Sequence, residues 1–106
     1  MADWIDVGTV DEIPPGSHKV ADVNDVLIAV FNVGGQFYAI EDVCTHDGGI
    51  LTGGQVKDCI ITCPRHGATF DIRTGMALTA PAYEPTATFP VRIEGGRVQV
   101  KDDRWD

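Results

Sequence analysis

The chain has 106 residues, 43% of them hydrophobic, with 12 glycines and 6 prolines, a length that suits one domain over 1–106 and not two. Its formal net charge of −8 makes nucleic acid and anionic membranes poor partners, because phosphate binding needs clustered bases. No apolar run approaches the roughly 20 residues that cross a bilayer. The acidic N-terminus also lacks the basic-then-apolar layout of a signal peptide, so we expect a soluble, cytoplasmic protein.

The predicted elements of the first half are a helical turn and a hairpin. Residues 9–12 read Thr-Val-Asp-Glu, which fits a capping box, but the two prolines shortly after them stop the helix after one turn. Residues 26–33 and 36–42 are rich in β-forming side chains and flank Gly34-Gly35. A glycine pair between two such runs is a strong signal for a tight hairpin.

The second half is also predicted to consist of short strands. Its segments rich in β-forming residues are 59–63, 68–72, 86–93 and 97–102. Gly75 follows the second of them and suits a bulge position with positive φ, and Pro90 is expected at a sheet edge or a bulge. The sequence therefore predicts an all-β domain in which hairpins from both ends form the base. The middle, about 43–83, is expected to be a loop-rich excursion that carries all three cysteines and two of the three histidines.

The acidic residues are concentrated in the first half. Residues 1–50 hold nine acids against the single base Lys19, whereas residues 51–106 hold seven of each sign. One interpretation is a solvated acidic face that keeps the protein in solution. The other is a field that steers a basic protein partner toward the chain.

Two closely spaced Cys–His pairs carry the strongest functional signal. Cys44 and His46 form the first pair, and Cys63 and His66 form the second. Three cysteines in total exclude an all-thiolate cluster within one chain, which leaves structural zinc or an iron–sulfur centre of mixed ligation. Structural zinc usually begins with two cysteines two to four residues apart. Pairs of one thiolate and one imidazole suit a binuclear cluster better, with the thiolates on one iron and the imidazoles on the other.

The pattern C-x-H-x₁₆-C-x₂-H resembles the signature of Rieske [2Fe-2S] proteins, and the segments FYAIEDVCTH, GATFDIRTG and PAYEP resemble Rieske ferredoxins. The resemblance implies an antiparallel β-sandwich base with an inserted cluster-binding subdomain, and one 2Fe-2S cluster as cofactor. It also implies that Cys44 and Cys63 hold one iron while His46 and His66 hold the outer iron. Pro81 would belong to a loop that covers the cluster.

Four further positions distinguish the kinds of Rieske protein. High-potential members carry a disulfide where this chain has Gly49 and Arg65, and hydroxyl donors where it has Ala68 and Phe70. Because those hydroxyls stabilise the added electron, their replacement implies a potential near the low end of the Rieske range, about −150 mV. These features resemble the ferredoxins of ring-hydroxylating oxygenase systems.

The resemblance implies an electron carrier that is not itself an enzyme. It would take single electrons from a ferredoxin reductase and pass them to a terminal non-haem iron oxygenase. One alternative is the Rieske-like small subunit of an assimilatory nitrite reductase, although some of those lack the ligands that are all present here. A zinc-stabilised interaction module is an alternative of another class, and it would contain no acid-labile sulfide.

Two residues of ligand type remain outside the motifs. Cys59 begins an apolar segment, where we expect a small buried side chain without a metal. His18 lies outside both motifs and is expected to be an exposed turn or strand residue.

Overall fold

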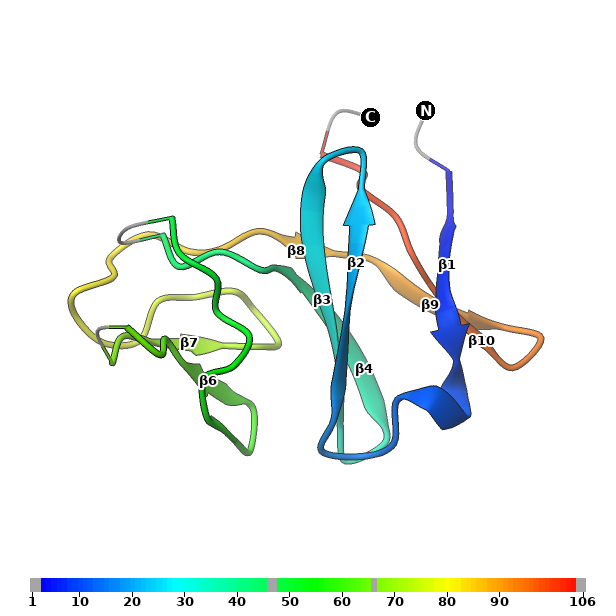
Figure 1. Cartoon of the computed structure of the whole chain (residues 1–106), viewed down its shortest axis with the longest axis horizontal. Helices are drawn as coiled ribbons and strands as arrows, with labels where there is room; N and C mark the ends of the chain where they lie inside the picture. Colours follow the sequence, from blue (N-terminus) through cyan, green and yellow to red (C-terminus); the bar gives the residue numbers. More distant parts are fainter. Residues whose placement is uncertain (1–2, 46–47, 66, 105–106) are drawn as a thin grey trace.

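The computed structural model describes residues 3–45, 48–65 and 67–104. Its elements are β1 (Ile5–Thr9), the 3-10 helix η1 (Val10–Glu12), β2 (His18–Val23), β3 (Val26–Val33), β4 (Gln36–Glu41), β5 (Val56–Lys57), β6 (Ile60–Thr62), β7 (Thr69–Asp71), β8 (Thr88–Phe89), β9 (Val91–Glu94) and β10 (Arg97–Val100). These strands pair antiparallel in three sheets, with the orders β1-β10-β9, β2-β3-β4-β8 and β5-β6-β7 (Figure 1). The prediction of an all-β fold is confirmed.

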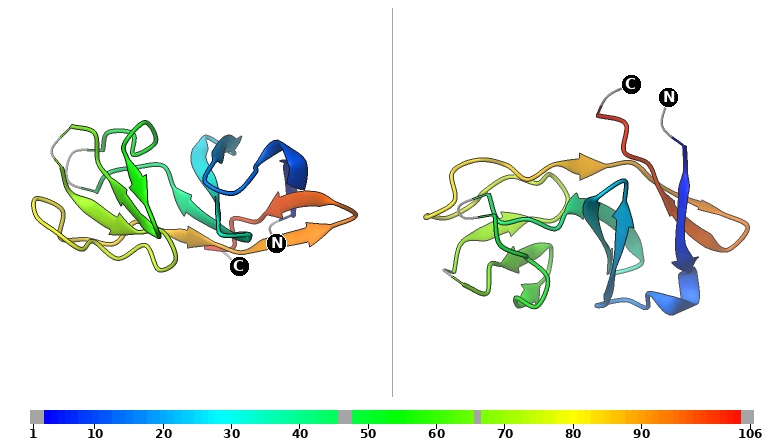
Figure 2. Two further views of the ribbon diagram at one scale, coloured as in Figure 1. Left: turned by 90° about the horizontal axis from the view of Figure 1, so that it is seen from below. Right: turned by 45° about the horizontal axis from the view of Figure 1, so that its top comes forward.

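Two of the sheets form the base of the molecule. The sheet β1-β10-β9 packs against β2-β3-β4-β8, and both contribute to one apolar core (Figures 1 and 2). Its buried residues are Val7, Ile13, Val23, Ile28, Val30, Ala39, Phe89, Val98 and Val100. Pro90 lies between β8 and β9, which belong to different sheets. A proline is tolerated there because no strand ladder continues through it.

The third sheet, β5-β6-β7, lies in the chain between β4 and β8 and to one side of the base (Figure 1). A second core joins it to the base. In that core Ala29 and Phe31 of β3 and Ile40 of β4 pack with residues of the excursion, including Ile61 and Phe70. Strand β3 is therefore buried on both faces, which explains why its sequence is apolar without interruption from Val26 to Phe31 and does not alternate with polar residues.

The predicted glycine hairpin is confirmed. Val33 of β3 is directly opposite Gln36 of β4, and the two residues between them, Gly34 and Gly35, have φ of 62° and 92°. A two-residue turn with positive φ at both positions matches the twist of the strands, and glycine adopts it without steric cost. Gly75 also has a positive φ, 77°, as predicted.

The N-terminal strands were not among the predicted elements. The pairing of strand β1 is interrupted by an irregularity between Asp6 and Gly8. In β2 only the last residue, Val23, is buried, with 4% of its surface exposed. Neither strand therefore has a regular apolar pattern. Among the described residues, η1 is the one helical segment. No helix in this part of the chain is long and apolar enough to span a bilayer.

The two ends of the described chain lie side by side on the base. Ile5 of β1 is opposite Val100 of β10, and both strands are distant from the sheet β5-β6-β7 (Figure 1). The molecule measures 39 × 30 × 18 Å along its principal axes.

Candidate metal centre

The structure places the two predicted cysteine ligands in one core. Cys44 and Cys63 are 0% and 1% exposed, and both belong to the apolar cluster between the base and the excursion. The predicted histidine ligands, His46 and His66, lie outside the described residues. The thiols are therefore brought together from segments 19 residues apart and shielded from water.

The first cysteine loop follows β4. The backbone N–H of Cys44 donates to the carbonyl oxygen of Gly49 at 2.7 Å, and the N–H of Gly48 donates to the carbonyl oxygen of Cys44 at 2.7 Å. Gly48 has φ of 76°, a conformation that side chains with a Cβ rarely adopt. These bonds turn the chain tightly around the cysteine.

The second cysteine loop follows β6 and repeats this pattern. The N–H of Cys63 donates to the carbonyl oxygen of Ala68 at 2.6 Å, and the N–H of Gly67 donates to the carbonyl oxygen of Cys63 at 3.0 Å. Gly67 has φ of 78°, close to that of Gly48. Each cysteine thus occupies the same position in the same backbone frame, and the loops present their thiols in equivalent local geometry.

A buried carboxylate holds the first loop in place. Asp42 is 4% exposed, and its Oδ1 accepts hydrogen bonds from the N–H groups of Leu51 at 3.0 Å and Thr52 at 2.8 Å. Its Oδ2 accepts a bond of 2.6 Å from the hydroxyl of Thr52. Sequence reasoning missed Asp42, because an aspartate next to a glutamate at a strand end reads as a solvated charge.

A third loop lies against the cysteine loops. Ala82 is 3% exposed and belongs to the same core as the cysteines, and its neighbour Pro81 is half-buried. The hydroxyl of Thr45 donates to the carbonyl oxygen of Glu84 at 2.7 Å. This bond ties the residue after Cys44 to the loop that the sequence singled out through Pro81.

The third cysteine is separate from this arrangement. Cys59 precedes β6, is only partly buried, and does not belong to the core that contains the other two. The prediction of a buried side chain at Cys59 was therefore wrong, since this side chain is only partly buried. Its segment is nevertheless fixed, because its carbonyl oxygen accepts the N–H of Ile72 at 2.7 Å.

The donors suit a cluster of mixed ligation. Two shielded thiols in matched loops can bind one iron as thiolates, and the sequence supplies one histidine within each loop. Within the described ranges, no group of three or more His, Cys, Asp or Glu side chains could hold a metal ion.

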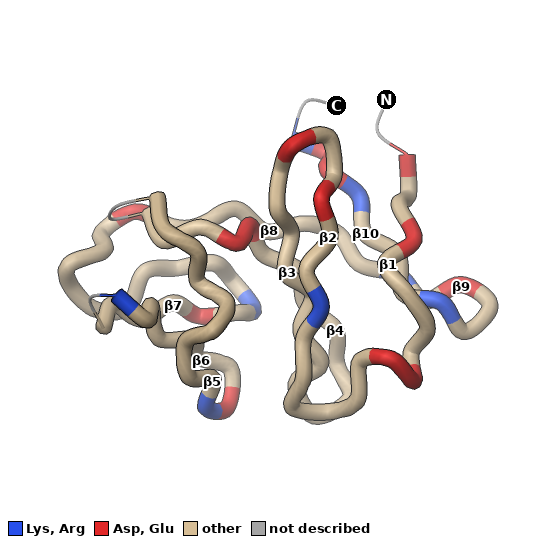
Figure 3. Tube along the Cα trace, in the orientation of Figure 1, with Lys and Arg blue, Asp and Glu red and all other residues tan. Residues whose placement is uncertain are grey.

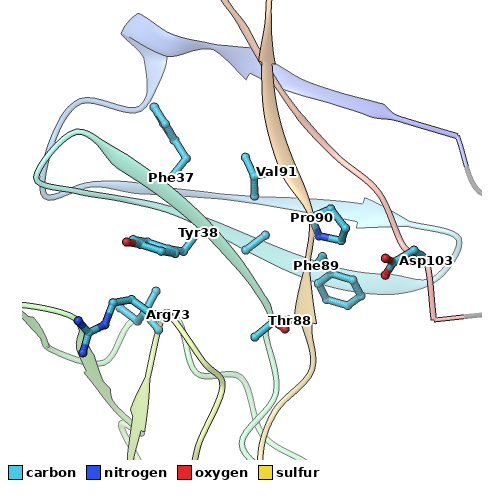
Figure 4. Close-up of a pocket in the computed structure, with 10 residues that line it drawn as sticks. Phe37, Tyr38, Arg73, Thr88, Phe89, Pro90, Val91 and Asp103 are labelled. Atoms are coloured by element: carbon cyan, nitrogen blue, oxygen red, sulfur yellow. The ribbon is translucent and has the colours of Figure 1, made fainter.

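A hollow of about 410 Å³ lies elsewhere, where β4 and β8 meet the turn after β7 (Figure 4). Phe37, Tyr38 and Phe89 line it together with Arg73, and neither Cys44 nor Cys63 is among its lining residues. Arg73 is hydrogen-bonded to Asp71 at 3.3 Å, and this guanidinium holds the pKa of the Asp71 carboxyl below its usual value. The hollow is thus distinct from the cysteine loops.

Comparison with known proteins assigns the arrangement. The family model described as the Rieske [2Fe-2S] domain matches residues 3–90. The 3-phenylpropionate/cinnamic acid dioxygenase ferredoxin subunit of Shigella flexneri serotype 5b (strain 8401) is 43% identical over 90 residues, which are 84% of each chain.

Solved structures agree with this result. The ferredoxin of carbazole 1,9a-dioxygenase from Nocardioides aromaticivorans IC177 is 30% identical with a TM-score of 0.87, over 92% of this chain and 95% of that one. A chain from the complex of reduced oxygenase and oxidized ferredoxin in carbazole 1,9a-dioxygenase is 37% identical with a TM-score of 0.86, over 92% and 91%. The chain belongs to the Rieske [2Fe-2S] domain family, and its cofactor is a 2Fe-2S cluster.

Proposed function

We propose that the chain is the ferredoxin of a ring-hydroxylating dioxygenase system and works in the cytoplasm. It accepts one electron from a ferredoxin reductase and delivers it to a terminal non-haem iron oxygenase. The observation that carries the proposal is the pair of equivalent, buried cysteine loops in a chain whose relatives are dioxygenase ferredoxin subunits. The protein is an electron carrier and not itself the enzyme. The same relatives favour a dioxygenase system over the nitrite reductase alternative.

The proposed ligands are the four residues of the two motifs. Cys44 and Cys63 bind one iron, His46 and His66 bind the other, and residues about 43–83 form the cluster-binding part of a single domain over 1–106. When bound, the cluster takes up and releases one electron, which leaves the reductase oxidised by one electron and the oxygenase reduced by one. Family membership removes the zinc module as an alternative.

The side chains around the thiols affect the reduction potential of the cluster. Ala68 and Phe70 are both fully buried in the core that contains Cys44 and Cys63. Neither has a hydroxyl that could donate to a cluster sulfur or to a thiolate. Since such donors stabilise the reduced state, their absence supports a potential near the low end of the Rieske range, about −150 mV.

Exposed apolar side chains next to the cysteine loops offer a contact surface for the partners. Ile50, in the first loop, is 50% exposed, and Tyr83, in the loop tied to Thr45, is 82% exposed. Large exposed apolar and aromatic residues are typical of protein contact sites. We propose that Ile50 and Tyr83 contact both the reductase and the oxygenase.

The acidic charge of the first half lies mainly on the base. Asp6 is in β1, Glu12 in η1, and Asp22 and Asp25 lie at the β2–β3 turn (Figure 3). This charge can therefore steer a basic reductase only through its long-range field. Reduction by the reductase should then slow as salt rises, because screening shortens the Debye length to about 8 Å at physiological strength. A rate that does not depend on salt would leave solubility as the role of these residues.

Reconstitution tests the proposed function. The loaded chain is mixed with a purified dioxygenase reductase and its oxygenase, and aromatic product is measured with and without the chain. We expect turnover to require the chain, and Tyr83→Ala to slow electron delivery while the visible spectrum stays unchanged. The matched control is Ile93→Ala on β9, since Ile93 is 47% exposed but lies on the base. Full turnover without the chain would contradict the proposal.

A further inference from the structure

The clamp formed by Asp42 joins the base to the far end of the first cysteine loop. The N–H of Asp42 donates to the carbonyl oxygen of Leu27 in β3 at 2.8 Å, which fixes its backbone to the central sheet. Its carboxylate accepts hydrogen bonds from the backbone N–H groups of Leu51 and Thr52. Leu51 is fully buried in the core with Cys44. One residue, through its backbone and its side chain, therefore sets both where the loop begins and where it ends.

The carboxylate of Asp42 has the hydrogen-bond partners of an ionised acid. Two N–H groups reach Oδ1, and the hydroxyl of Thr52 reaches Oδ2. Acceptance at both oxygens suits the ionised form, which carries no hydrogen of its own. None of the Lys or Arg ion pairs in 3–45, 48–65 and 67–104 involves Asp42. Among the residues that the structure describes, the donors to this carboxylate are therefore neutral groups.

This charge lies close to a proposed ligand. Asp42 precedes Cys44 by two residues, so their Cα atoms are at most about 7 Å apart. A 2Fe-2S cluster with two thiolates and two neutral imidazoles has no net charge when oxidised and one negative charge when reduced. A fixed negative charge nearby therefore disfavours the reduced state, and burial leaves it less screened than a surface charge.

We propose that Asp42 is a positioning residue that also lowers the reduction potential of the cluster: it clamps the first cysteine loop, and its buried negative charge opposes the added electron. The proposal rests on the proposed function. It concerns properties of the isolated loaded chain, however, so they are measured without either partner.

The variant Asp42→Asn separates the two roles. The amide oxygen can still accept both N–H groups, and the amide nitrogen can donate to the Thr52 hydroxyl, so the clamp stays while the charge is removed. We expect unchanged iron and sulfide content and an equilibrium for electron uptake about tenfold more favourable than in the parent, which is about 59 mV for a one-electron couple. Voltammetry of the purified protein measures this shift.

Two other variants sharpen the test. Glu41→Gln removes the same charge one residue away, from a side chain that is 31% exposed and ion-paired with Arg104 at 3.3 Å. Its shift should be smaller and should vanish at high salt, whereas the Asp42→Asn shift should persist. Thr52→Val keeps the charge but removes the hydroxyl bond that partly neutralises it, so the potential should fall.

The clamp itself is read by hydrogen exchange. Asp42→Ala removes all three acceptor contacts, so a peptide covering 48–55 should exchange faster than in the parent, while Asp42→Asn should restore most of its protection. An unchanged or lower potential in Asp42→Asn would overturn the electrostatic role. If Asp42→Asn does not hold a cluster, Thr52→Val tests the electrostatic role alone. A potential that does not fall in Thr52→Val would then overturn that role. Equal protection in Ala and parent would overturn the positioning role.

Discussion

The hydroxyl of Thr45 donates a hydrogen bond of 2.7 Å to the carbonyl oxygen of Glu84, across 39 positions of sequence. Thr45 directly follows Cys44 in the first cysteine loop, and Glu84 lies in the loop that contains Pro81 and the buried Ala82. Among the residues that the structure describes, this bond links the two loops through a side chain. The loop that contains Pro81 is therefore fixed to the residue that follows a proposed ligand.

Replacing Thr45 by valine should loosen this link. The side chain keeps its shape but loses its donor, so we expect the free energy of unfolding to fall by about 1 kcal/mol and the cluster to be lost faster. Chemical denaturation and the decay of the visible absorbance measure the two effects. Thr88→Val on the exposed side of β8 is the control, and an equal loss in both variants would deny the bond a specific role.

Gly75 lies where an added side chain has no room. A Cβ at this position would lie 2.2 Å from the carbonyl oxygen of Thr86, and φ is 77°. Gly75→Ala should therefore lower the free energy of unfolding by about 3 kcal/mol or more. Gly34→Ala is the matched control, because Gly34 also has a positive φ but open space around it. It should cost only about 1–2 kcal/mol, and a comparable loss in the two variants would show that the contact with Thr86 is unimportant.

Each proposed ligand should be required for cluster assembly. Cys44→Ser, Cys63→Ser, His46→Ala and His66→Ala should each lose most of the iron and acid-labile sulfide, whereas the parent should contain two of each per chain. Cys59→Ala should keep the cluster, since Cys59 lies outside the core that holds the other cysteines. Metal and sulfide analysis decides. Iron lost from Cys59→Ala but retained in His46→Ala would refute the assignment.

Hydroxyl groups beside the cysteines should raise the reduction potential. Ala68 and Phe70 are fully buried in the core with Cys44 and Cys63, so Ala68→Ser with Phe70→Tyr places two donors there. A hydrogen bond to a charged acceptor contributes roughly 1.5–3 kcal/mol, of which only the difference between redox states counts. We expect a rise on the order of 50–150 mV, measured by voltammetry. A fall, or no change, would mean that the new hydroxyls do not reach the cluster.

The sequence predicts best where one residue type has few structural uses. Gly34-Gly35 between two apolar runs allowed one hairpin, and the structure has it with Val33 opposite Gln36. The spacing of Cys44 and Cys63 within their motifs likewise predicted a shared site, and the two thiols occupy one core.

Contacts between distant segments were not predictable in the same way. The hydrogen bonds of Asp42 with Leu51 and Thr52 depend on the path of the loop between them. The sequence alone does not distinguish a buried aspartate from a solvated one. Strand β2 was not predicted for another reason. It is mostly exposed, so its own sequence has no clear apolar pattern, and it is a strand because it pairs with β3.

The adjacency of Ile5 and Val100 has a practical consequence for electrochemistry. A linker or affinity tag at either end emerges from the base, whereas the cysteine loops lie beside the sheet β5-β6-β7 on the other side of the molecule (Figure 1). A protein attached to an electrode through either end would therefore hold its cysteine loops away from the support. Attachment through Cys59, next to β6, would bring the side with the cysteine loops toward the electrode. The two orientations should differ in interfacial electron-transfer rate, with the faster rate for the Cys59 attachment.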